Sequence, residues 1–347
     1  DSYEGKKIHS ARWDHEYDLG DKRAAVIGTG ASAVQIIPEL VKSATSVKVF
    51  QRTPGWVLPR GNFKHPAWVR SPFKHVPVSE QALRDAWFWA HEMMAVGMVW
   101  NTAATSAIQL AAKAHLRRQV KDTWLRRQLT PHFRPGCKRM LMTSDYYPAL
   151  QADNCKLISW PIATLSANGV RTADGIEHEV DCIVFATGFD VAKRGTPFPI
   201  SGLDGRKLGD EWSQGTFAFK SVSVAGYPNL FFTFGPNSGP GHNSALVYME
   251  AAIDYLVQAI TFLQQNDIDT LDVRKDRQNS YHSSIQRRLR RTTWNSGCSS
   301  WYLTEDGYNG TMYPGFATQF MRELTQLDLR DYEITRRDAN LAVTQSR

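Results

Sequence analysis

Six residues near the start of the chain have the types and spacing of a phosphate-binding turn. Residues 28–33 read Gly-Thr-Gly-Ala-Ser-Ala, a G-x-G-x-x-A pattern that follows an apolar run at 22–27 and precedes a helical pattern. In such a turn Gly28 makes the sharp bend, Gly30 lets the backbone approach a pyrophosphate, and Ala33 lets the helix pack closely on the strand. This context favours a dinucleotide site over an ordinary glycine-rich turn.

The residues after the next apolar run select between the two nicotinamide cofactors. An NADH site carries Asp or Glu about 20 residues after the first glycine, at the end of the second strand. Here residues 46–50 are followed by Gln51, Arg52 and Thr53, with no carboxylate at that point. The planar Arg52 guanidinium suits a 2′-phosphate, and Thr53 can add a hydroxyl. The pattern predicts NADPH; the alternative is that Arg52 is a plain surface cation.

The first half of the chain must position this turn within a parallel α/β sheet. Strands are expected at 22–27 and 46–50, with a helix at 31–43 between them, which is the start of a βαβ unit. Residues 54–80 are rich in Pro, Gly and Trp and predict an irregular loop. Residues 80–130 lack proline and predict two helices, the second one basic.

The second half turns from strands to helices. The pair at 174–175, Asp-Gly between alternating apolar runs, predicts a hairpin. A strand is expected at 178–185, another at 229–234, a long helix at 244–265 and a further helix near 280–291.

Composition excludes several classes of protein. The 347 residues are 42% hydrophobic and 22% charged, which is ordinary globular usage and excludes disordered and fibrous chains. The net charge of +7 suits an anionic ligand such as a nucleotide, and we expect no nucleic-acid partner.

Neither a metal centre nor a membrane span is expected. The four cysteines form no CxxC pair and no zinc-like spacing with histidine, and the protein is expected to be cytoplasmic. Residues 93–112 carry no charge but hold Asn, Thr, Ser and Gln, so we interpret them as a buried or amphipathic helix without membrane contact.

A pattern ahead of the first strand resembles the fingerprint of the Baeyer–Villiger monooxygenases, F-x-G-x-x-x-H-x-x-x-W-[P/D]. Its matching residues are Tyr3, Gly5, His9, Trp13 and Asp14, with Tyr3 in place of Phe. Residues 47–60, 181–190, 229–244 and 300–315 are similar to further segments of that family. The resemblance covers nearly all of 1–340.

The resemblance implies an α/β flavoprotein with two dinucleotide-binding domains. Residues 1–20 would be a linker carrying the fingerprint, 21–190 a Rossmann-like NADP domain with a helical insertion at about 61–135, and 191–347 the C-terminal part of an FAD domain. The N-terminal FAD-binding segment of the family is not found, so we expect the isolated chain to bind FAD poorly and to be inactive.

The chemistry implied by the resemblance is oxygen insertion with FAD and NADPH. NADPH would reduce FAD, O₂ would form a C4a-peroxyflavin, and its attack on a ketone carbonyl would give an ester or lactone. Two alternatives stay open. One is a flavin monooxygenase that oxidises N or S atoms, and the other is a non-catalytic NADP-binding module.

The resemblance also assigns residues to roles. Arg139 matches the family's catalytic arginine, a permanent cation beside the peroxide. Lys138 would reach the 2′-phosphate and Trp301 the nicotinamide cofactor. Apart from the resemblance, Asn243 and Ser244 lie where a glycine-rich turn meets the long helix, so free N–H groups there could face flavin carbonyls or an oxyanion. The alternative is that Asn243 or Ser244 is a helix N-cap. The other cofactor-binding residues implied are Thr29, Ala31, Ser32, Gln35, Thr187 and Gly188.

Overall fold

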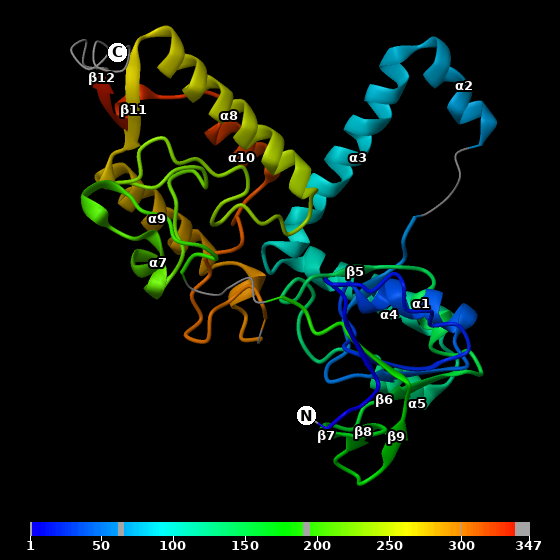
Figure 1. The fold of residues 1–347 in the computed structure, drawn as a ribbon. Coiled ribbons are helices and arrows are strands. Elements are labelled where there is room, and N and C mark those ends of the chain that lie inside the picture. Colours follow the sequence, from blue (N-terminus) through cyan, green and yellow to red (C-terminus); the bar gives the residue numbers. More distant parts are fainter. Residues whose placement is uncertain (1, 62–65, 190–194, 299, 337–347) are drawn as a thin grey trace. The chain divides into compact units, whose positions relative to one another are not determined.

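The computed structural model describes residues 2–61, 66–189, 195–298 and 300–336. They belong to two compact units (Figure 1), the first built from 1–64 and 105–189 and the second from 65–104 and 190–347. The boundary expected at 190/191 falls outside the described residues. Residues 65–104, expected inside the insertion of the NADP domain, group with the second unit.

A five-stranded parallel sheet organises unit 1. Its spatial order is β1-β10-β2-β3-β6. The strands are β1 (Lys6–His9), β2 (Arg23–Ile27), β3 (Ser46–Phe50), β6 (Cys155–Ile158) and β10 (Cys182–Phe185). The two strands expected around the phosphate turn are confirmed. The expected linker contributes β1, an edge strand of this sheet.

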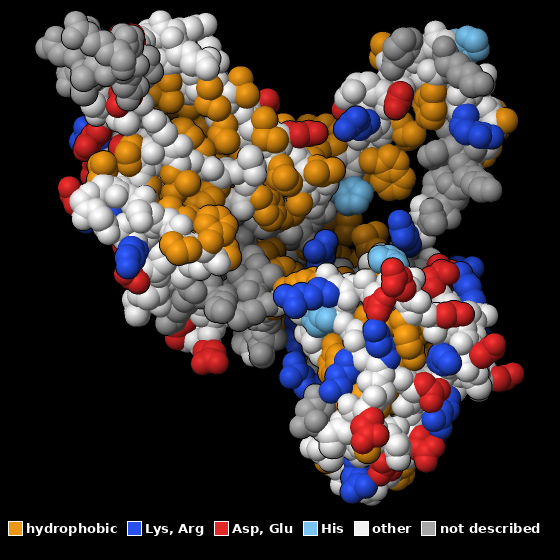
Figure 2. Space-filling model, in the orientation of Figure 1, with side chains coloured by type: hydrophobic (Ala, Val, Ile, Leu, Met, Phe, Trp, Pro, Cys, Tyr) orange, Lys and Arg blue, Asp and Glu red, His pale blue; other side chains and the backbone are white. Residues whose placement is uncertain are grey.

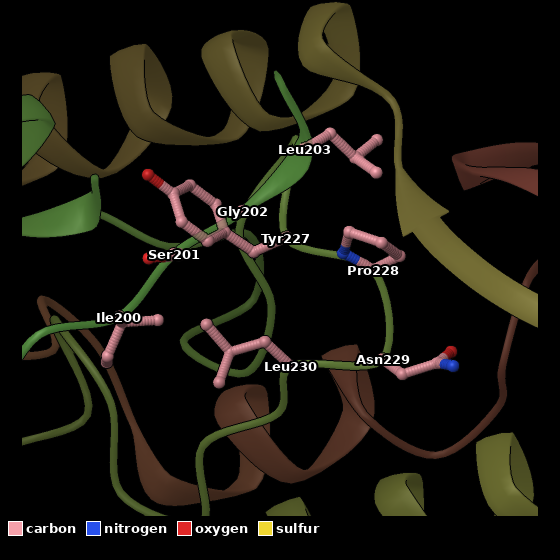
Figure 3. Close-up of a pocket in the computed structure, with 8 residues that line it drawn as sticks. All are labelled: Ile200, Ser201, Gly202, Leu203, Tyr227, Pro228, Asn229 and Leu230. Atoms are coloured by element: carbon pink, nitrogen blue, oxygen red, sulfur yellow. The ribbon is translucent and has the colours of Figure 1, made fainter. Parts of the chain in front are cut away.

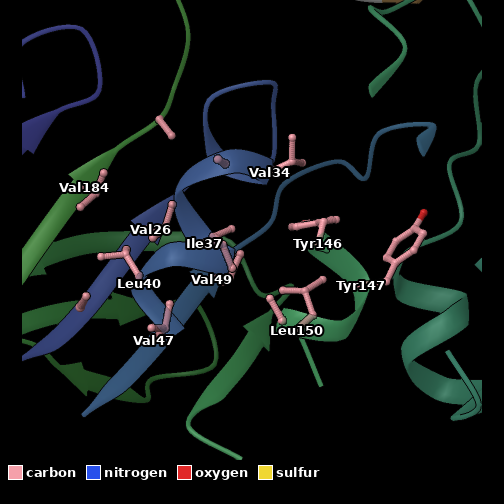
Figure 4. Packing of buried hydrophobic residues seen from close by; sticks show 14 of the residues in the cluster. Val26, Val34, Ile37, Leu40, Val47, Val49, Tyr146, Tyr147, Leu150 and Val184 are labelled. Carbon is pink, nitrogen blue, oxygen red and sulfur yellow. The ribbon is translucent and has the colours of Figure 1, made fainter. Parts of the chain in front are cut away.

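One face of this sheet packs on α1 (Ala33–Ser43) and α6 (Tyr146–Ala149). Figure 4 shows Ile37 and Leu40 of α1 turned toward Val26 and Val49 of the strands. Because side chains alternate along a strand, the neighbouring residues pack on the opposite face. The packed sheet holds the carboxyl ends of β2, β3 and β10 at one edge.

An antiparallel sheet covers the opposite face. It consists of β7 (Ile162–Ser166), β8 (Gly169–Thr172) and β9 (Glu177–Glu179). Its hairpin at 174–175 confirms the prediction, with Gly175 at a φ of +86°. The remaining elements assigned mostly to unit 1 are β4 (Val57–Leu58), β5 (Leu141–Met142), α4 (Ala103–Gln119) and α5 (Thr123–Gln128).

Unit 2 is mainly helical, and its core is aromatic. Tyr248, Tyr255, Trp294, Tyr313 and Phe320 are fully buried in one cluster. The helices are α2 (Ala67–His75), α3 (Pro77–Met98), α7 (Leu208–Glu211), α8 (Ala245–Gln265), α9 (Lys275–Leu289) and α10 (Ala317–Glu323). Short 3₁₀ turns occupy Leu203–Gly205, Trp212–Gln214, Thr293–Asn295 and Leu329–Asp331, and β11 (Ile268–Val273) pairs antiparallel with β12 (Tyr332–Arg336).

Five expectations about elements are wrong. Residues 80–130 hold three helices, α3, α4 and α5, in place of two. Residues 178–185 are not one strand, because β9 ends at Glu179 and β10 begins at Cys182 in another sheet. Residues 54–80 are not an irregular loop, since they contain β4, α2 and the start of α3. Residues 93–112 are not one helix, because α3 ends at Met98 and α4 begins at Ala103. Residues 229–234 form no strand, since only an isolated bridge joins Phe231 to Ser223, and a single extended segment needs a neighbouring ladder.

Among the described residues one helix, α8, is long and apolar enough to cross a membrane by length and composition. The core helix of a globular protein can have the same length and hydropathy, and four residues of α8 are buried in the protein core.

Asp181 joins the starts of two neighbouring strands. Its carboxylate accepts a hydrogen bond from the Arg23 backbone N–H at 2.8 Å and from Nη2 of the same residue at 2.7 Å. The Arg23 side chain, followed by its backbone N–H, lowers the pKa of Asp181 below the ordinary value. The stability from this contact is present above the unfolded pKa of about 4 and is lost as the pH falls through the folded value.

Replacing Asp181 with Asn is expected to lower the free energy of unfolding at pH 7 by about 1 kcal/mol, a modest value because the carboxylate is partly exposed. The difference between wild type and variant should shrink between pH 5 and pH 3, as measured by urea unfolding. Asp153→Asn, at an exposed position of the same unit, is the control. A constant difference across this pH range would contradict the assignment.

Candidate functional site

The phosphate turn begins at a position that accepts only glycine. The Gly28 N–H donates to the Phe50 carbonyl at 3.0 Å, and the residue has a φ of +111°. A Cβ on Gly28 would lie 2.4 Å from the Ala186 carbonyl oxygen, which is fixed in turn by the Ala186 N–H bond to Ile27. The bend therefore depends on both backbone conformation and a close approach of two strand ends.

The next residues leave backbone donors free at the N-terminus of α1. Gly30 is exposed, and a Cβ there would meet no atom within 4 Å. Within the described parts of the chain, the N–H groups of Gly30, Ala31 and Ser32 have no partner. The Ser32 side chain makes no capping bond, and the first turn of α1 holds no acidic residue. These donors, with the helix dipole, form an anion-binding surface.

Two further predicted residues hold the turn in shape. The Thr29 hydroxyl donates to the Thr53 carbonyl at 3.0 Å and so ties the turn to the residues after β3. The Gln35 side-chain amide donates to the Ala31 carbonyl at 2.8 Å. In this structure Thr29 and Gln35 therefore act on the protein backbone.

Two cations lie close together beside the end of β3. Burial, and then the positive charge of Arg52, lowers the pKa of Lys138. The Lys138 ammonium lies 5.2 Å from the centroid of the Phe133 ring. In the described ranges neither Arg52 nor Lys138 has an acidic partner. Two neighbouring cations without a counter-ion suit a doubly charged phosphate.

Three further predicted residues of unit 1, Arg139, Thr187 and Gly188, are solvent-exposed. Arg139 follows Lys138 directly and leads into β5, whose Leu141 N–H donates to the Trp56 carbonyl at 2.9 Å. Thr187 and Gly188 follow β10, which places them at the same edge of the sheet as the phosphate turn. Gly188 has a φ of +94°.

The fingerprint residues build the edge of the sheet. The buried Tyr3 hydroxyl donates to the Val180 carbonyl at 3.0 Å, and His9 Nδ1 accepts from the Ala11 N–H at 3.2 Å. A Cβ on Gly5 would collide with the Tyr3 ring. The other two fingerprint residues also contact protein. Trp13 is partly buried and packs against the core cluster that includes Ile37 of α1, and Asp14 forms a 2.5 Å ion pair with Lys6.

Asn243 and Trp301 belong to unit 2. Ser244 caps α8, since its hydroxyl accepts from the Leu246 N–H at 3.2 Å. The Asn243 side-chain oxygen Oδ1 accepts from the Ser244 N–H at 2.9 Å. Trp301 is partly exposed, with its ring centroid 4.3 Å from that of Tyr302.

Sequence reasoning missed Glu92 of α3. Glu92 is 2% exposed and contacts the segment before α8, with His242 Nε2 at 3.1 Å from its Oε2. The one signal in the sequence was a carboxylate directly before the uncharged stretch that begins at Met93.

Two hollows in the surface lie elsewhere. One, of about 310 Å³, is lined by residues 200–203 and 227–230 of unit 2 (Figure 3). The other, of about 440 Å³, includes Gly5, Arg23 and Asp181 of unit 1. Of the predicted site residues only Gly5 lines either of them.

Comparison with known proteins gives consistent matches. The family model described as flavin-binding monooxygenase-like matches residues 1–68. A Baeyer–Villiger monooxygenase of Pseudomonas aeruginosa is 40% identical over 340 residues, which are 96% of this chain and 64% of that protein. An uncharacterized monooxygenase of Mycobacterium tuberculosis is 34% identical over 97% of this chain and 68% of its own length. The chain thus spans just under two-thirds of the first of these relatives.

A solved structure shares the fold. The crystal structure of OTEMO in complex with FAD and NADP superposes with a TM-score of 0.79 at 24% identity, covering 96% of this chain and 71% of that one. At this level of identity the likeness is one of fold, and it supports the arrangement expected for a protein with two dinucleotide-binding domains.

Proposed function

Because the chain belongs to the flavin-binding monooxygenase family that includes the Baeyer–Villiger monooxygenases, we propose that the whole protein is an FAD- and NADPH-dependent monooxygenase. Its substrates would be a ketone and O₂, and its product an ester or lactone. The observation that carries the proposal is the phosphate turn at 28–33 beside the two unpaired cations Arg52 and Lys138.

The residues of unit 1 fit NADPH. Free N–H groups at Gly30, Ala31 and Ser32 would hold the pyrophosphate, and the open space over Gly30 leaves room for it. Arg52 and Lys138 would pair with the 2′-phosphate. Thr187 and Gly188, at the same sheet edge, would border the cofactor.

For FAD, unit 2 offers one part of a site. The N–H of Ala245, at the start of the 21-residue α8, has no partner among the residues that the structure describes. Such a helix start can face the electronegative edge of a flavin ring. The FAD phosphates need a second glycine-rich turn, and we propose that residues outside this sequence supply it.

An exposed apolar face of α8 supports that arrangement. Leu246, Ile253, Val257 and Ile260 recur at helical spacing, and Figure 2 shows hydrophobic side chains gathered over α8. Exposed apolar patches of this kind mark contact surfaces. The face fits the FAD-binding segment expected for the whole protein.

Three side chains of this chain would have distinct roles in the proposed reaction. Bound FAD would accept hydride from NADPH and supply the activated oxygen. Arg139, a permanent cation, would stabilise negative charge as it develops on oxygen. Trp301 would contact the nicotinamide cofactor, and Asn243 would border the flavin.

The test is NADPH oxidation and O₂ uptake by the purified, FAD-supplemented whole protein, which includes the proposed FAD-binding segment, with a cyclic ketone, and product identification by mass spectrometry. A lactone formed in step with NADPH supports the proposal. Oxidation of a thioether, with no lactone, would favour the N- or S-oxygenating alternative. Tight NADPH binding without any O₂ uptake would favour the non-catalytic module.

Replacing Arg52 with Ala is expected to weaken NADPH binding roughly 10- to 150-fold, which corresponds to the loss of about 1.5–3 kcal/mol for a hydrogen bond to a charged group. NADH binding should change less than twofold, since NADH lacks the 2′-phosphate. Titration calorimetry with both nucleotides measures this change in selectivity. Arg127→Ala, at an exposed position on α5, is the control. An equal loss for both nucleotides would contradict the assignment.

A further inference from the structure

The buried carboxylate of Glu92 is surrounded by hydrogen-bond donors. Its Oε1 accepts from the Thr318 N–H at 2.9 Å and from the Thr318 hydroxyl at 2.7 Å. Its Oε2 accepts from the Ala317 N–H at 3.1 Å and lies 3.1 Å from His242 Nε2. The last contact is a hydrogen bond when His242 carries its proton on Nε2, which leaves Nδ1 as the unprotonated nitrogen of a neutral ring.

This carboxylate is ionised at neutral pH. Burial raises the pKa of Glu92, but the hydrogen bonds from Thr318, and then those from His242 and Ala317, outweigh burial and lower the pKa below the ordinary value. Its partners come from chain segments 150 and 225 residues away. A single negative charge thus joins α3 to the segment before α8 and to the start of α10.

A buried charge is a costly way to stabilise a core. Apolar side chains of similar volume often give equal or greater stability, whereas a charge with several fixed partners defines their positions. His242 depends on this contact, because its Nδ1 is buried and has no partner in the described part of the protein. Glu92 is therefore what orients the imidazole.

The contact continues toward α8. Asn243 Nδ2 lies 3.5 Å from Glu92 Oε2, and Asn243 Oδ1 accepts from the Ser244 N–H. Ser244 in turn caps α8. The direction of the first turn of α8 thus depends on residues 242–244, which Glu92 holds.

We propose that Glu92 is a positioning residue for the start of α8. It fixes His242 and Asn243 and thereby aims the free N–H of Ala245 at the ring of a bound flavin. The proposal rests on the proposed function, in which α8 contributes to the FAD site. It assigns a role in cofactor binding to α3, a helix that the NADPH site of unit 1 does not include.

The first experiment compares Glu92→Gln with wild type, both as the whole protein that includes the proposed FAD-binding segment. Gln keeps the shape of the side chain but replaces one acceptor oxygen with a donor NH₂ group. It therefore cannot accept hydrogen bonds both from Thr318 and from Ala317 and His242. We expect the Kd for FAD to rise about tenfold, as for one lost hydrogen bond, and the visible absorption bands of the bound flavin to shift. The Tm should fall by roughly 6–12 °C. Glu250→Gln, at an exposed position on α8, should leave all three unchanged.

Unchanged NADPH binding shows that unit 1 of the variants is intact, and a cooperative thermal transition together with an unchanged far-UV circular dichroism spectrum shows that unit 2 is folded. A second variant, His242→Gln, tests the route of the effect. If Glu92 acts through His242, the double variant should raise the Kd for FAD no more than the larger single change. Additive changes would overturn the proposed route.

The possible results separate the two proposals. A lower Tm for Glu92→Gln with an unchanged flavin spectrum and unchanged Kd for FAD would mean a structural role only and would overturn the inference. Wild-type protein that binds FAD but oxygenates no ketone would overturn the proposed function. The Kd for FAD and the flavin spectrum of Glu92→Gln would in that case still test the role of Glu92. Whole wild-type protein that binds no FAD at all would overturn both.

Discussion

Replacing Arg139 with Ala is expected to lower the rate of ketone oxygenation about 100- to 1,000-fold, the usual cost of removing one group that stabilises a developing oxyanion. NADPH binding should be nearly unchanged, because the phosphate turn and Arg52 remain. The exposed Arg139 leads directly into β5, and in the described chain segments it has no acidic partner that neutralises it. Its charge is therefore available to a ligand.

The measurement is lactone formed per NADPH consumed. The variant should still oxidise NADPH but release hydrogen peroxide in place of lactone. Arg134→Ala, an exposed neighbour in the same loop, should oxygenate at the wild-type rate. Arg139→Lys should recover part of the loss, since it keeps the charge without the planar fork. Lactone formation by Arg139→Ala above a tenth of the wild-type rate would refute the role.

The glycines of the phosphate turn should respond to alanine in opposite ways. Gly28→Ala places a side chain at a φ of +111° and against the Ala186 carbonyl oxygen. We expect the free energy of unfolding to fall by roughly 2–5 kcal/mol, from backbone strain plus overpacking. Gly30→Ala meets no protein atom within 4 Å and should unfold like wild type. Its methyl group would occupy the space of the pyrophosphate and weaken NADPH binding roughly 5- to 150-fold.

Urea unfolding and nucleotide titration of both variants test this contrast. Gly175→Ala is a matched control. Gly175 has a positive φ like Gly28 and open surroundings like Gly30, but it lies in the β8–β9 hairpin. It should show the cost of backbone strain without any effect on nucleotide binding. A Gly30→Ala variant that binds NADPH like wild type would place the nucleotide elsewhere.

The parts of the fold that the sequence predicted well depend on local signals. Short local sequence patterns predict β2, the turn at Gly28 and β3, and another predicts the hairpin at Gly175. The long helix α8 was found to within one residue, because its apolar pattern and its cap at Ser244 are adjacent. In each case the contacts that decide the structure lie within about one helical turn or one strand pair.

The parts that were missed depend on partners far along the chain. The segment with Phe231 looks like a strand in sequence but has only an isolated bridge beside it. The strand β11 pairs with β12, some sixty residues later, and neither was predicted. The sequence around Glu92 gives no sign of its role, because its partners His242 and Thr318 are 150 and 226 residues away along the chain. The sequence pattern predicted the nucleotide turn but not the cluster that orients α8.

The discontinuous build of unit 2 has a consequence for synthesis on the ribosome. Residues 65–104 are made early, but their partners in the same unit begin at 190. Glu92 precedes Ala317 by 225 residues, so at roughly 5–20 residues per second it waits about 11–45 s for that partner. Synthesis of unit 1 is complete at residue 189, so we expect this unit to fold first. Until the rest of unit 2 is made, α2 and α3 lack their packing partners. During that interval the apolar side of α3 is open to chaperones and proteases, and a pause in translation after residue 189 would prolong its exposure.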